Sequence, residues 1–367
     1  MTAPGADAAL AGVAAYGLAT TREQPTEPLE QAAFAALLLG AERHRILGLL
    51  GAAVGAGDFP VTDDQHDLLE QQLQAWLAHA LRVERLLLVA VGALADAAID
   101  HRVLKGVALA HSVYPDPAWR VFGDVDLLVP PDMLTRAASV LEHALPAARE
   151  APELRPGFDD RFGKEVLLRV GALELDLHRT FVEGALGLTL HLPDLWEAPD
   201  GCVIGGRGVA VLPAPQRLLH AAYAAVLGDW PPRFIARRDL AQILTLLDPD
   251  PERVLTLARR WRAEAVLARA LRETWETLGV RHTPWLVEWA RAHRSGRLDR
   301  LLVASHLGRA RAHTRHGVAL IVVSGVRARL AYLRAIAWPQ RAYLDARGMT
   351  RRGFLARPLG LARRLHP

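Results

Sequence analysis

The sequence contains few of the features that mark secreted, cysteine-rich or membrane-spanning proteins. Cys202 is the only cysteine among 367 residues, so the chain can form neither an internal disulfide nor a zinc site built from cysteines. The longest apolar runs, residues 86–95 and 317–323, are shorter than the roughly 20 residues that a membrane-spanning helix needs. The first residues also lack the basic and apolar regions of a secretory signal. We therefore expect a cytoplasmic protein without a transmembrane segment.

Lysine is scarce, although basic residues are not. Only two of the 44 basic residues are lysine, Lys105 and Lys164, and the rest are arginine. A compact ammonium differs from a planar guanidinium in size and hydration, so a lysine that is kept against this preference indicates a position where only an ammonium fits. The alternative is that two lysines remain by chance.

Acidic residues are nearly absent from the end of the chain. Residues 301–367 contain 13 arginines and a single acid, Asp345, whereas the whole chain has a net charge of only +4. The basic character therefore belongs to the C-terminal region. Such a region can bind nucleic acid, an anionic membrane surface or an acidic partner. It can equally be a solvated, arginine-rich helical surface.

Hydrophobic periodicity divides the chain into three regions. Residues 1–100 repeat apolar side chains at three- and four-residue spacing, for example over 32–56, which is typical of helices. Residues 101–212 mix short extended runs with helices, and residues 213–367 are helical again. We predict an α+β fold: an N-terminal helical region, a core with a small mixed sheet over 101–212, and a C-terminal helical domain with a basic tail.

Two carboxylates stand on one predicted strand, residues 121–129. A strand alternates its side chains, so Asp124 and Asp126 share one face. Adjacent carboxylates repel each other and need a compensating cation. Mg²⁺ fits this role, because it binds a few carboxylates together with substrate phosphates. The alternative is a solvated strand end in a polar turn.

A third carboxylate stands on a second predicted strand. Residues 172–178 alternate strictly, which puts Asp176 and His178 on one face and leucines on the other. If the strands are neighbours, Asp176 joins Asp124 and Asp126, and three acids can hold two metal ions about 4 Å apart. Asp176 is then the candidate general base or a ligand of the metal that activates the attacking hydroxyl. His178 is a candidate substrate contact, or a structural histidine.

The segment before this pair can bind phosphate. Lys105 and Gly106 lie where a predicted strand runs into a helix, so free backbone N–H groups and the helix dipole favour an anion there. Gly106 lets phosphate oxygens approach the backbone, and Lys105 and Arg120 supply positive charge. A phosphate cradle beside a metal-binding carboxylate pair predicts a site for a nucleoside triphosphate.

These residues together resemble a known pattern. The sequence is similar to the uncharacterised nucleotidyltransferase family 5 of the DNA polymerase β superfamily in Leu104-Lys105-Gly106, Tyr114-Pro115, Arg120, Gly123-Asp124-Val125-Asp126-Leu127-Leu128-Val129 and Asp176-Leu177-His178. The likeness covers about residues 90–245. It implies a polymerase β-like core, two Mg²⁺ ions and a nucleoside triphosphate such as ATP as the donor. One departure is Val107, which follows Gly106 where better-known relatives carry serine.

The resemblance also assigns roles beyond the three aspartates. It adds Gly123 to the nucleotide-binding candidates Lys105, Gly106 and Arg120. Further along the chain, Leu218-Leu219-His220, Trp230 and Arg238-Asp239-Leu240 look like the helical segment that follows the core in the family. Asp239 is therefore a candidate substrate contact, with pairing to a nearby arginine as the alternative.

Two functions from different classes remain open. The first is a metal-dependent enzyme that moves a nucleotidyl or phosphoryl group from a nucleoside triphosphate to a hydroxyl of a peptide, small molecule or RNA. The second is a catalytically inactive protein with the same fold that binds RNA or an acidic peptide through its basic C-terminal region. Attachment to a membrane surface by residues 318–337 is a third, less favoured interpretation. The sequence contains no P-loop, no dinucleotide-binding glycine fingerprint after a strand and no HExxH.

Overall fold

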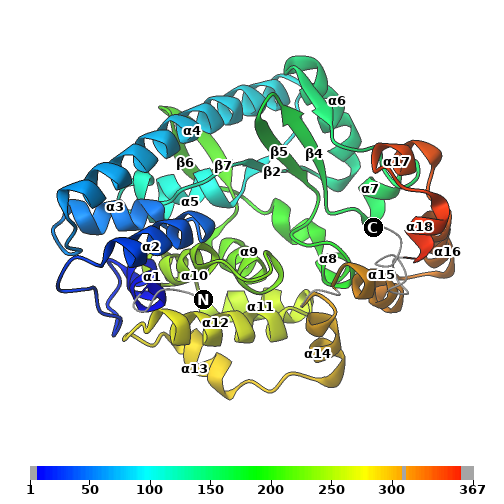
Figure 1. Ribbon diagram of the computed structural model, residues 1–367. Helices are drawn as coiled ribbons and strands as arrows, with labels where there is room; N and C mark the ends of the chain where they lie inside the picture. The colour runs from blue at the N-terminus through cyan, green and yellow to red at the C-terminus, as the bar shows by residue number, and fades with distance from the viewer. Residues whose placement is uncertain (1–5, 308–310, 357–367) are drawn as a thin grey trace.

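The computed structural model describes residues 6–307 and 311–356 (Figure 1). Residues 357–367, the end of the predicted basic tail, lie outside the described residues. Every strand of the described residues falls between Arg102 and Val211, with helices before, among and after them. The predicted α+β fold class is confirmed. The division into three domains stays a prediction.

Helices make up the N-terminal region. They are α1 (Ala6–Ala15), α2 (Gln31–Arg43), α3 (Leu47–Gly55) and α4 (Asp63–Asp96). A capping box starts α4: the Thr62 hydroxyl accepts from the Gln65 backbone N–H, and the Gln65 side chain accepts from the Thr62 N–H. The run 32–56 is two helices rather than one, because the chain turns at 44–46, where Arg45 adopts a positive φ of 56°.

The strands form one mixed sheet. In the order β3-β4-β5-β2-β1-β7-β6, β2 pairs in parallel with β5 and β1 with β7, and the other neighbours are antiparallel. The strands are β1 (Arg102–Val103), β2 (Val125–Leu128), β3 (Ala147–Arg149), β4 (Glu165–Val170), β5 (Leu173–His178), β6 (Asp200–Ile204) and β7 (Arg207–Val211). The turn between the antiparallel strands β4 and β5 contains Gly171, which takes a φ of 59°. The strand predicted over 121–129 is shorter, since β2 begins at Val125.

The alternation of β2 and β5 gives the sheet two chemically different faces. Val125, Leu127, Leu175 and Leu177 are buried in one apolar cluster with residues of α4 and of α6 (Leu134–Ala144). The intervening side chains, Asp126, Asp176 and His178, point to the opposite face. That face is turned toward helices α9 (Ala214–Leu227) and α10 (Phe234–Leu247), which lie below the sheet in Figure 1.

Shorter helices connect the strands, and a helical layer follows them. The connecting elements are α5 (Lys105–Val113), η1 (Pro117–Trp119), η2 (Pro131–Met133), α6, α7 (Phe158–Phe162), α8 (Ala185–Thr189) and η3 (Leu192–Trp196). The later helices are α9 (Ala214–Leu227), α10 (Phe234–Leu247), α11 (Pro251–Arg260), α12 (Glu264–Leu278), α13 (Trp285–Ala292), α14 (Arg297–Ala304), α15 (Arg311–Val322), α16 (Val326–Ala337), α17 (Arg341–Ala346) and α18 (Arg351–Ala356). None of the helices in the described ranges is long and apolar enough to cross a membrane.

Candidate active site

The polar face of the sheet brings two of the predicted acids together. Asp126 on β2 and Asp176 on β5 are paired residues of two adjacent parallel strands. Ligand atoms of Asp126, Asp176 and His178 all lie within 4.8 Å of one another. The sequence motifs on two separate strands therefore meet in space as their alternation predicted.

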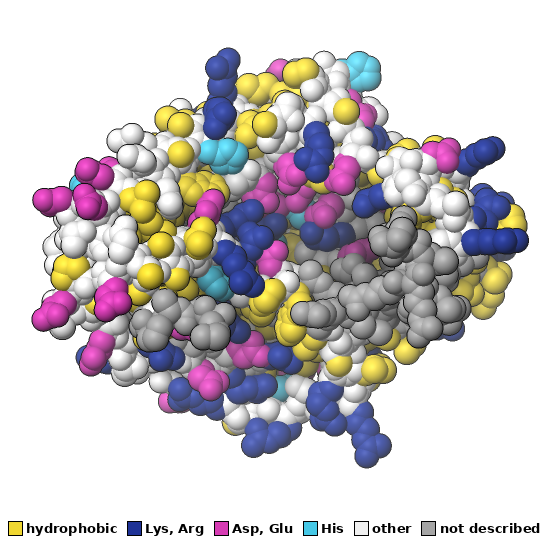
Figure 2. All heavy atoms as spheres, in the orientation of Figure 1, with side chains coloured by type: hydrophobic (Ala, Val, Ile, Leu, Met, Phe, Trp, Pro, Cys, Tyr) yellow, Lys and Arg dark blue, Asp and Glu magenta, His cyan; other side chains and the backbone are white. Residues whose placement is uncertain are grey.

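A cavity of about 400 Å³ opens in front of this cluster, between the sheet and the helices α9 and α10. Figure 2 shows acidic and basic side chains gathered around a hollow in this face of the molecule. The predicted site residues that line the cavity are Lys105, Gly106, Arg120, Asp124, Asp126, Asp176 and Asp239. Gly123 and His178 are not among the residues that line the cavity. Both lysines of the chain, Lys105 and Lys164, do line it.

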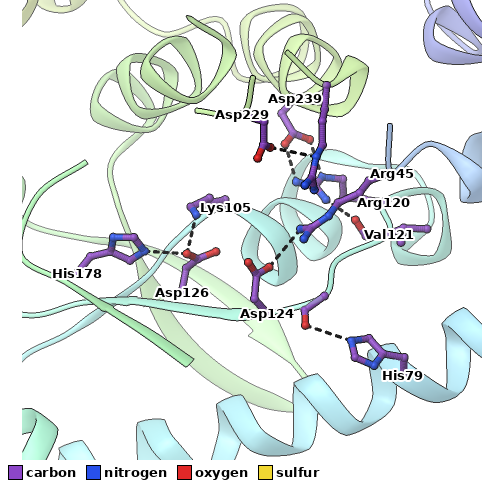
Figure 3. Close-up of polar contacts among 12 residues, drawn as sticks. Arg45, His79, Lys105, Arg120, Val121, Asp124, Asp126, His178, Asp229 and Asp239 are labelled. Atoms are coloured by element: carbon purple, nitrogen blue, oxygen red, sulfur yellow. Dashed lines mark hydrogen bonds and ion pairs between the residues drawn. The ribbon is translucent and has the colours of Figure 1, made fainter. Parts of the chain in front are cut away.

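Asp126 is the centre of the charged cluster. Its Oδ1 atom lies 2.6 Å from the Lys105 Nζ and 2.7 Å from the His178 Nε2 (Figure 3). Burial opposes ionisation of Asp126, yet the Lys105 ammonium and the His178 ring outweigh it and hold the pKa of this carboxyl well below its usual range. The same pairing outweighs the burial of Lys105 and raises the pKa of its ammonium. Both groups are therefore charged at neutral pH.

Glu165, at the start of β4, is a site residue that the sequence did not reveal. It pairs with His178 in register, and its Oε2 lies 3.2 Å from His178 Nδ1 and 2.5 Å from Lys164 Nζ. These two ion pairs hold the Glu165 carboxylate beside the buried ring of His178. The carboxylate oxygens of Asp126 and Asp176, which converge next to it, suit a hard divalent cation such as Mg²⁺, which takes oxygen ligands.

Asp176 differs from Asp126 in the direction of its pKa shift. Burial, and then the nearby negative charge of Glu165, raises the pKa of the Asp176 carboxyl to about 6. The two paired aspartates thus have pKa values displaced in opposite directions, because Lys105 and His178 bind Asp126 directly, whereas burial and Glu165 dominate at Asp176. A carboxyl with a pKa near 6 can both take up and release a proton close to neutral pH.

Asp124 faces a different partner. It precedes β2, and its Oδ1 lies 3.3 Å from the Nη1 of Arg45, which comes from the turn between α2 and α3. Asp124 lines the same cavity as Asp126 and Asp176 but stands outside the group of ligand atoms within 4.8 Å. The sequence did not point to Arg45, since the apolar run around it reads as a single helix.

Arg120 and Asp239 are bound to each other. The Arg120 Nε and Nη2 atoms donate to the two carboxylate oxygens of Asp239, each at 2.8 Å, and the Tyr114 hydroxyl donates to Asp239 at 2.7 Å. Arg120 also donates to the Val121 carbonyl and is only 5% exposed. Burial works against the charge of Arg120, but Asp239 outweighs it and raises the guanidinium pKa. This pair ties the segment before β2 to α10.

The predicted phosphate turn has an unusual backbone. Lys105 has a positive φ of 27°, and the first turn of α5 is kinked at Gly106. A Cβ atom at Gly106 would lie 3.1 Å from the Cβ of Phe122, so a larger residue would push this segment away. Backbone strain of this kind persists where the surrounding structure enforces it, as at binding sites. The Gly123 carbonyl accepts from His79 Nε2 on α4 at 3.1 Å.

Aromatic groups of α9 and of the segment after β5 line the other wall. The His220 ring stacks on Phe181, with ring centroids 4.4 Å apart, and burial followed by the Lys105 charge holds the pKa of His220 well below its usual value. His220 is therefore neutral. The Tyr223 hydroxyl is buried and has no hydrogen-bond partner among the described residues, and burial raises the Tyr223 pKa. This wall offers unpaired polar atoms in apolar surroundings.

Comparison with known proteins gives one matching family and several similar solved structures. Residues 30–279 match the family described as uncharacterised nucleotidyltransferase. The solution structure of the antibiotic-resistance factor ANT(2″)-Ia is 20% identical, with 53% of this chain and 98% of that one covered, at a TM-score of 0.35. Its crystal structure with adenylyl-2″-tobramycin is 18% identical, covering 49% and 97%, at 0.36. A nucleotidyltransferase-like protein from Paracoccidioides brasiliensis is 15% identical, covering 55% and 94%, at 0.35. No curated protein matches the chain.

Proposed function

The chain belongs to the uncharacterised nucleotidyltransferase family, and from this premise we propose that it is a Mg²⁺-dependent enzyme that transfers a nucleotidyl group from a nucleoside triphosphate to a hydroxyl. One observation carries the proposal. Asp126 and Asp176 stand in register on adjacent strands, beside Lys105, at the edge of a cavity of about 400 Å³. That arrangement combines carboxylates for a divalent ion with a cation for phosphate.

Three carboxylates are available to hold the ion. Asp126 and Asp176 supply converging oxygens, and Asp124 supplies another from the same cavity. His178 fixes Asp126 by a hydrogen bond of 2.7 Å, which orients the carboxylate oxygens. A bound divalent ion would neutralise part of the triphosphate charge and help to ionise the acceptor hydroxyl.

The side chains of the cavity then assist different parts of the transfer reaction. The acceptor oxygen attacks the α-phosphorus, the bond from that phosphorus to the bridging oxygen breaks, and pyrophosphate leaves. Asp176 accepts the proton of the hydroxyl, since its pKa of about 6 leaves it mostly ionised at neutral pH. Lys105, which remains charged, offsets the negative charge of the phosphates, and Gly106 lets them approach the start of α5.

The remaining candidates line the cavity around the acceptor and the nucleoside. Asp239 and Arg120 form one wall as a fixed pair, while Phe181, His220 and Tyr223 form another. The acceptor is a peptide, a small molecule or RNA, and the donor is ATP or another nucleoside triphosphate. The arginine-rich C-terminal region is the candidate contact for an anionic acceptor such as RNA.

Labelled triphosphates test the proposal directly. Each of the four ribonucleoside triphosphates, labelled at the α- or at the γ-phosphate, is incubated with the protein, Mg²⁺ and separate pools of RNA, peptides and small molecules. Nucleotidyl transfer moves only the α-label to the acceptor, whereas phosphoryl transfer moves only the γ-label. Asp126→Asn should abolish labelling, and Asp132→Asn, an exposed acid on η2, should not.

Two results would count against the proposal. Labelling that persists when Mg²⁺ is chelated, or in Asp126→Asn, would remove the metal mechanism. Tight binding of RNA with a steep salt dependence and no consumption of any triphosphate would instead indicate a binding protein with an inactive core.

A further inference from the structure

Arg45 occupies a backbone position that normally belongs to glycine. Helix α2 ends in a Schellman motif: the Ile46 N–H donates to the Ala41 carbonyl at 2.8 Å, and the Arg45 N–H donates to the Glu42 carbonyl at 3.0 Å. Arg45 is the residue in the left-handed conformation, with a φ of 56°. A side chain there costs stability that glycine would not, so the backbone of this position does not itself call for an arginine.

The turn that carries Arg45 is fixed to the wall of the cavity. The His44 carbonyl accepts from the Ile235 N–H at 3.3 Å, His44 Nδ1 accepts from the Phe234 N–H at 3.2 Å, and the rings of His44 and Phe234 lie 4.4 Å apart. These contacts dock the turn onto the start of α10. From this anchored backbone, the flexible Arg45 side chain extends into the cavity toward Asp124 (Figure 3).

Arg45 differs from the other arginines of this part of the cavity in its partner. Arg120 is held by both oxygens of Asp239, and Arg233 pairs with Asp229 at 3.1 Å. Arg45 has one contact of 3.3 Å, and its side chain and that of Asp124 remain 28% and 22% exposed. The Arg233 pair is also a single contact between partly exposed groups, so Arg45 is set apart by its acceptor. A single long contact between half-buried groups is weak and easily exchanged. Its acceptor is also one of the three carboxylates proposed to hold the metal ion.

We propose that Arg45 is a triphosphate-binding residue that rests on Asp124 in the ligand-free protein and transfers to the phosphates when Asp124 takes up the metal ion. This inference depends on the proposed function. A guanidinium 3.3 Å from an oxygen that binds a divalent cation would face a like charge at short range. The incoming triphosphate supplies the replacement partner, and a guanidinium binds phosphate oxygens with two parallel hydrogen bonds.

The exchange gives Arg45 two opposite effects on binding. Arg45 competes with the metal ion for Asp124 when no nucleotide is present, and it contributes to binding once the nucleotide has arrived. The N-terminal helical region would thereby discourage occupation of the site by metal alone and favour metal and nucleotide together. If Arg45 had only a structural role, its removal would not increase the affinity for the metal ion while it decreases the affinity for the nucleotide.

Equilibrium binding separates these roles. Mn²⁺ alone is titrated by the loss of its free electron paramagnetic resonance signal, and the four α,β-methylene ribonucleoside triphosphates are titrated with Mg²⁺ by calorimetry. Arg45→Gly suits the positive φ and removes the side chain. It should bind Mn²⁺ about 3- to 10-fold more tightly and the analogue about 10- to 100-fold more weakly, as expected for the loss of a charged hydrogen bond to phosphate.

Two further variants complete the test. Arg45→Lys keeps the charge without the planar fork, so it should bind Mn²⁺ like the wild type and the analogue with intermediate affinity. Arg43→Ala removes an exposed arginine of the same helix end and should change neither titration. Circular dichroism and thermal unfolding confirm that each variant is folded.

The outcomes are distinct. If the wild type binds an analogue and Arg45→Gly binds both ligands equally well, or loses affinity for both, the inference fails while the proposed function stands. If the wild type binds none of the four analogues in the presence of Mg²⁺, both are overturned. Tighter Mn²⁺ binding together with weaker analogue binding in Arg45→Gly, absent in Arg43→Ala, supports the exchange.

Discussion

Lys105 and Lys164 stand at the two ends of one row of charged contacts. Asp126, His178 and Glu165 lie between them, with successive contacts of 2.6, 2.7, 3.2 and 2.5 Å. Each carboxylate of this row lies between a lysine ammonium and the buried His178 imidazole. Since each group is stabilised by its neighbours, the loss of one leaves another charge unpaired in a partly dry site. The row therefore fixes the carboxylates on which the proposed chemistry depends.

The first prediction concerns Asp126→Asn. This change should abolish nucleotidyl transfer, because a neutral amide neither holds a divalent cation nor balances Lys105. It should also lower the free energy of unfolding by about 1 to 3 kcal/mol, since Lys105 and His178 lose their shared partner. Urea denaturation measures this loss. A variant as stable as the wild type would show that the Asp126 contacts contribute nothing to the fold.

The second prediction uses the opposite shift of Asp176. Its pKa is about 6 in the folded protein and about 4 in an unfolded chain. Between these values the folded state binds more protons, so the ionisation of Asp176 should reduce stability as pH rises from about 4 to about 6. Asp176→Asn removes this effect. Without metal, it should exceed the wild type in unfolding free energy by about 1 kcal/mol at pH 7.5 and lose that advantage near pH 4.

Urea melts of both proteins at the two pH values, in the presence of a chelator, check this prediction. The comparison between variant and wild type cancels the titration of the other carboxyl groups. Asp176→Asn should still be inactive, because an amide cannot accept the proton of the acceptor hydroxyl. A variant that is less stable than the wild type at pH 7.5 would contradict the raised pKa.

Tyr223 supports a third prediction, with Tyr114 as its matched control. The Tyr223 hydroxyl is buried without a partner among the described residues, so Tyr223→Phe should raise the free energy of unfolding by about 1 kcal/mol. The Tyr114 hydroxyl donates to Asp239, so Tyr114→Phe should lower it by about 1 to 2 kcal/mol. Thermal and urea unfolding measure both changes. Equal destabilisation by the two substitutions would show that Tyr223 has a partner.

The strand patterns predicted the centre of the site. Strict alternation over 172–178 and the spacing of Asp124 and Asp126 predicted three acids on polar strand faces. The parallel pairing of β2 and β5 brings Asp126 and Asp176 side by side, whereas Asp124 lies just before β2. The register between strands distant in sequence is a tertiary property, so Glu165 could not be recognised, although its neighbour Lys164 shares the scarcity that marked Lys105.

Arg45 shows a different limit of sequence interpretation. An apolar periodicity over 32–56 indicates one helix, and the usual sign of a helix end, a glycine in the left-handed position, is missing because arginine stands there. Likewise, its charge assigned Arg120 to phosphate and the resemblance assigned Asp239 to substrate, whereas the structure shows the two side chains bound to each other. Both roles stay predictions, and pairing of Asp239 with an arginine was the alternative.

The last prediction concerns Lys105, one of two lysines in a chain whose other basic residues are arginines. The Lys105 ammonium lies 2.6 Å from Asp126 in a turn with a positive φ, where the kinked Gly106 packs closely against Phe122. A guanidinium is larger and planar, so Lys105→Arg should keep the charge but displace either Asp126 or the phosphates, and lower transfer by about 10- to 100-fold. Arg169→Lys, at a half-exposed ion pair on β4, should leave transfer unchanged. Initial rates with saturating triphosphate measure both. If Lys105→Arg transfers as fast as the wild type, either basic side chain is sufficient at this position, and the lysine is present by chance.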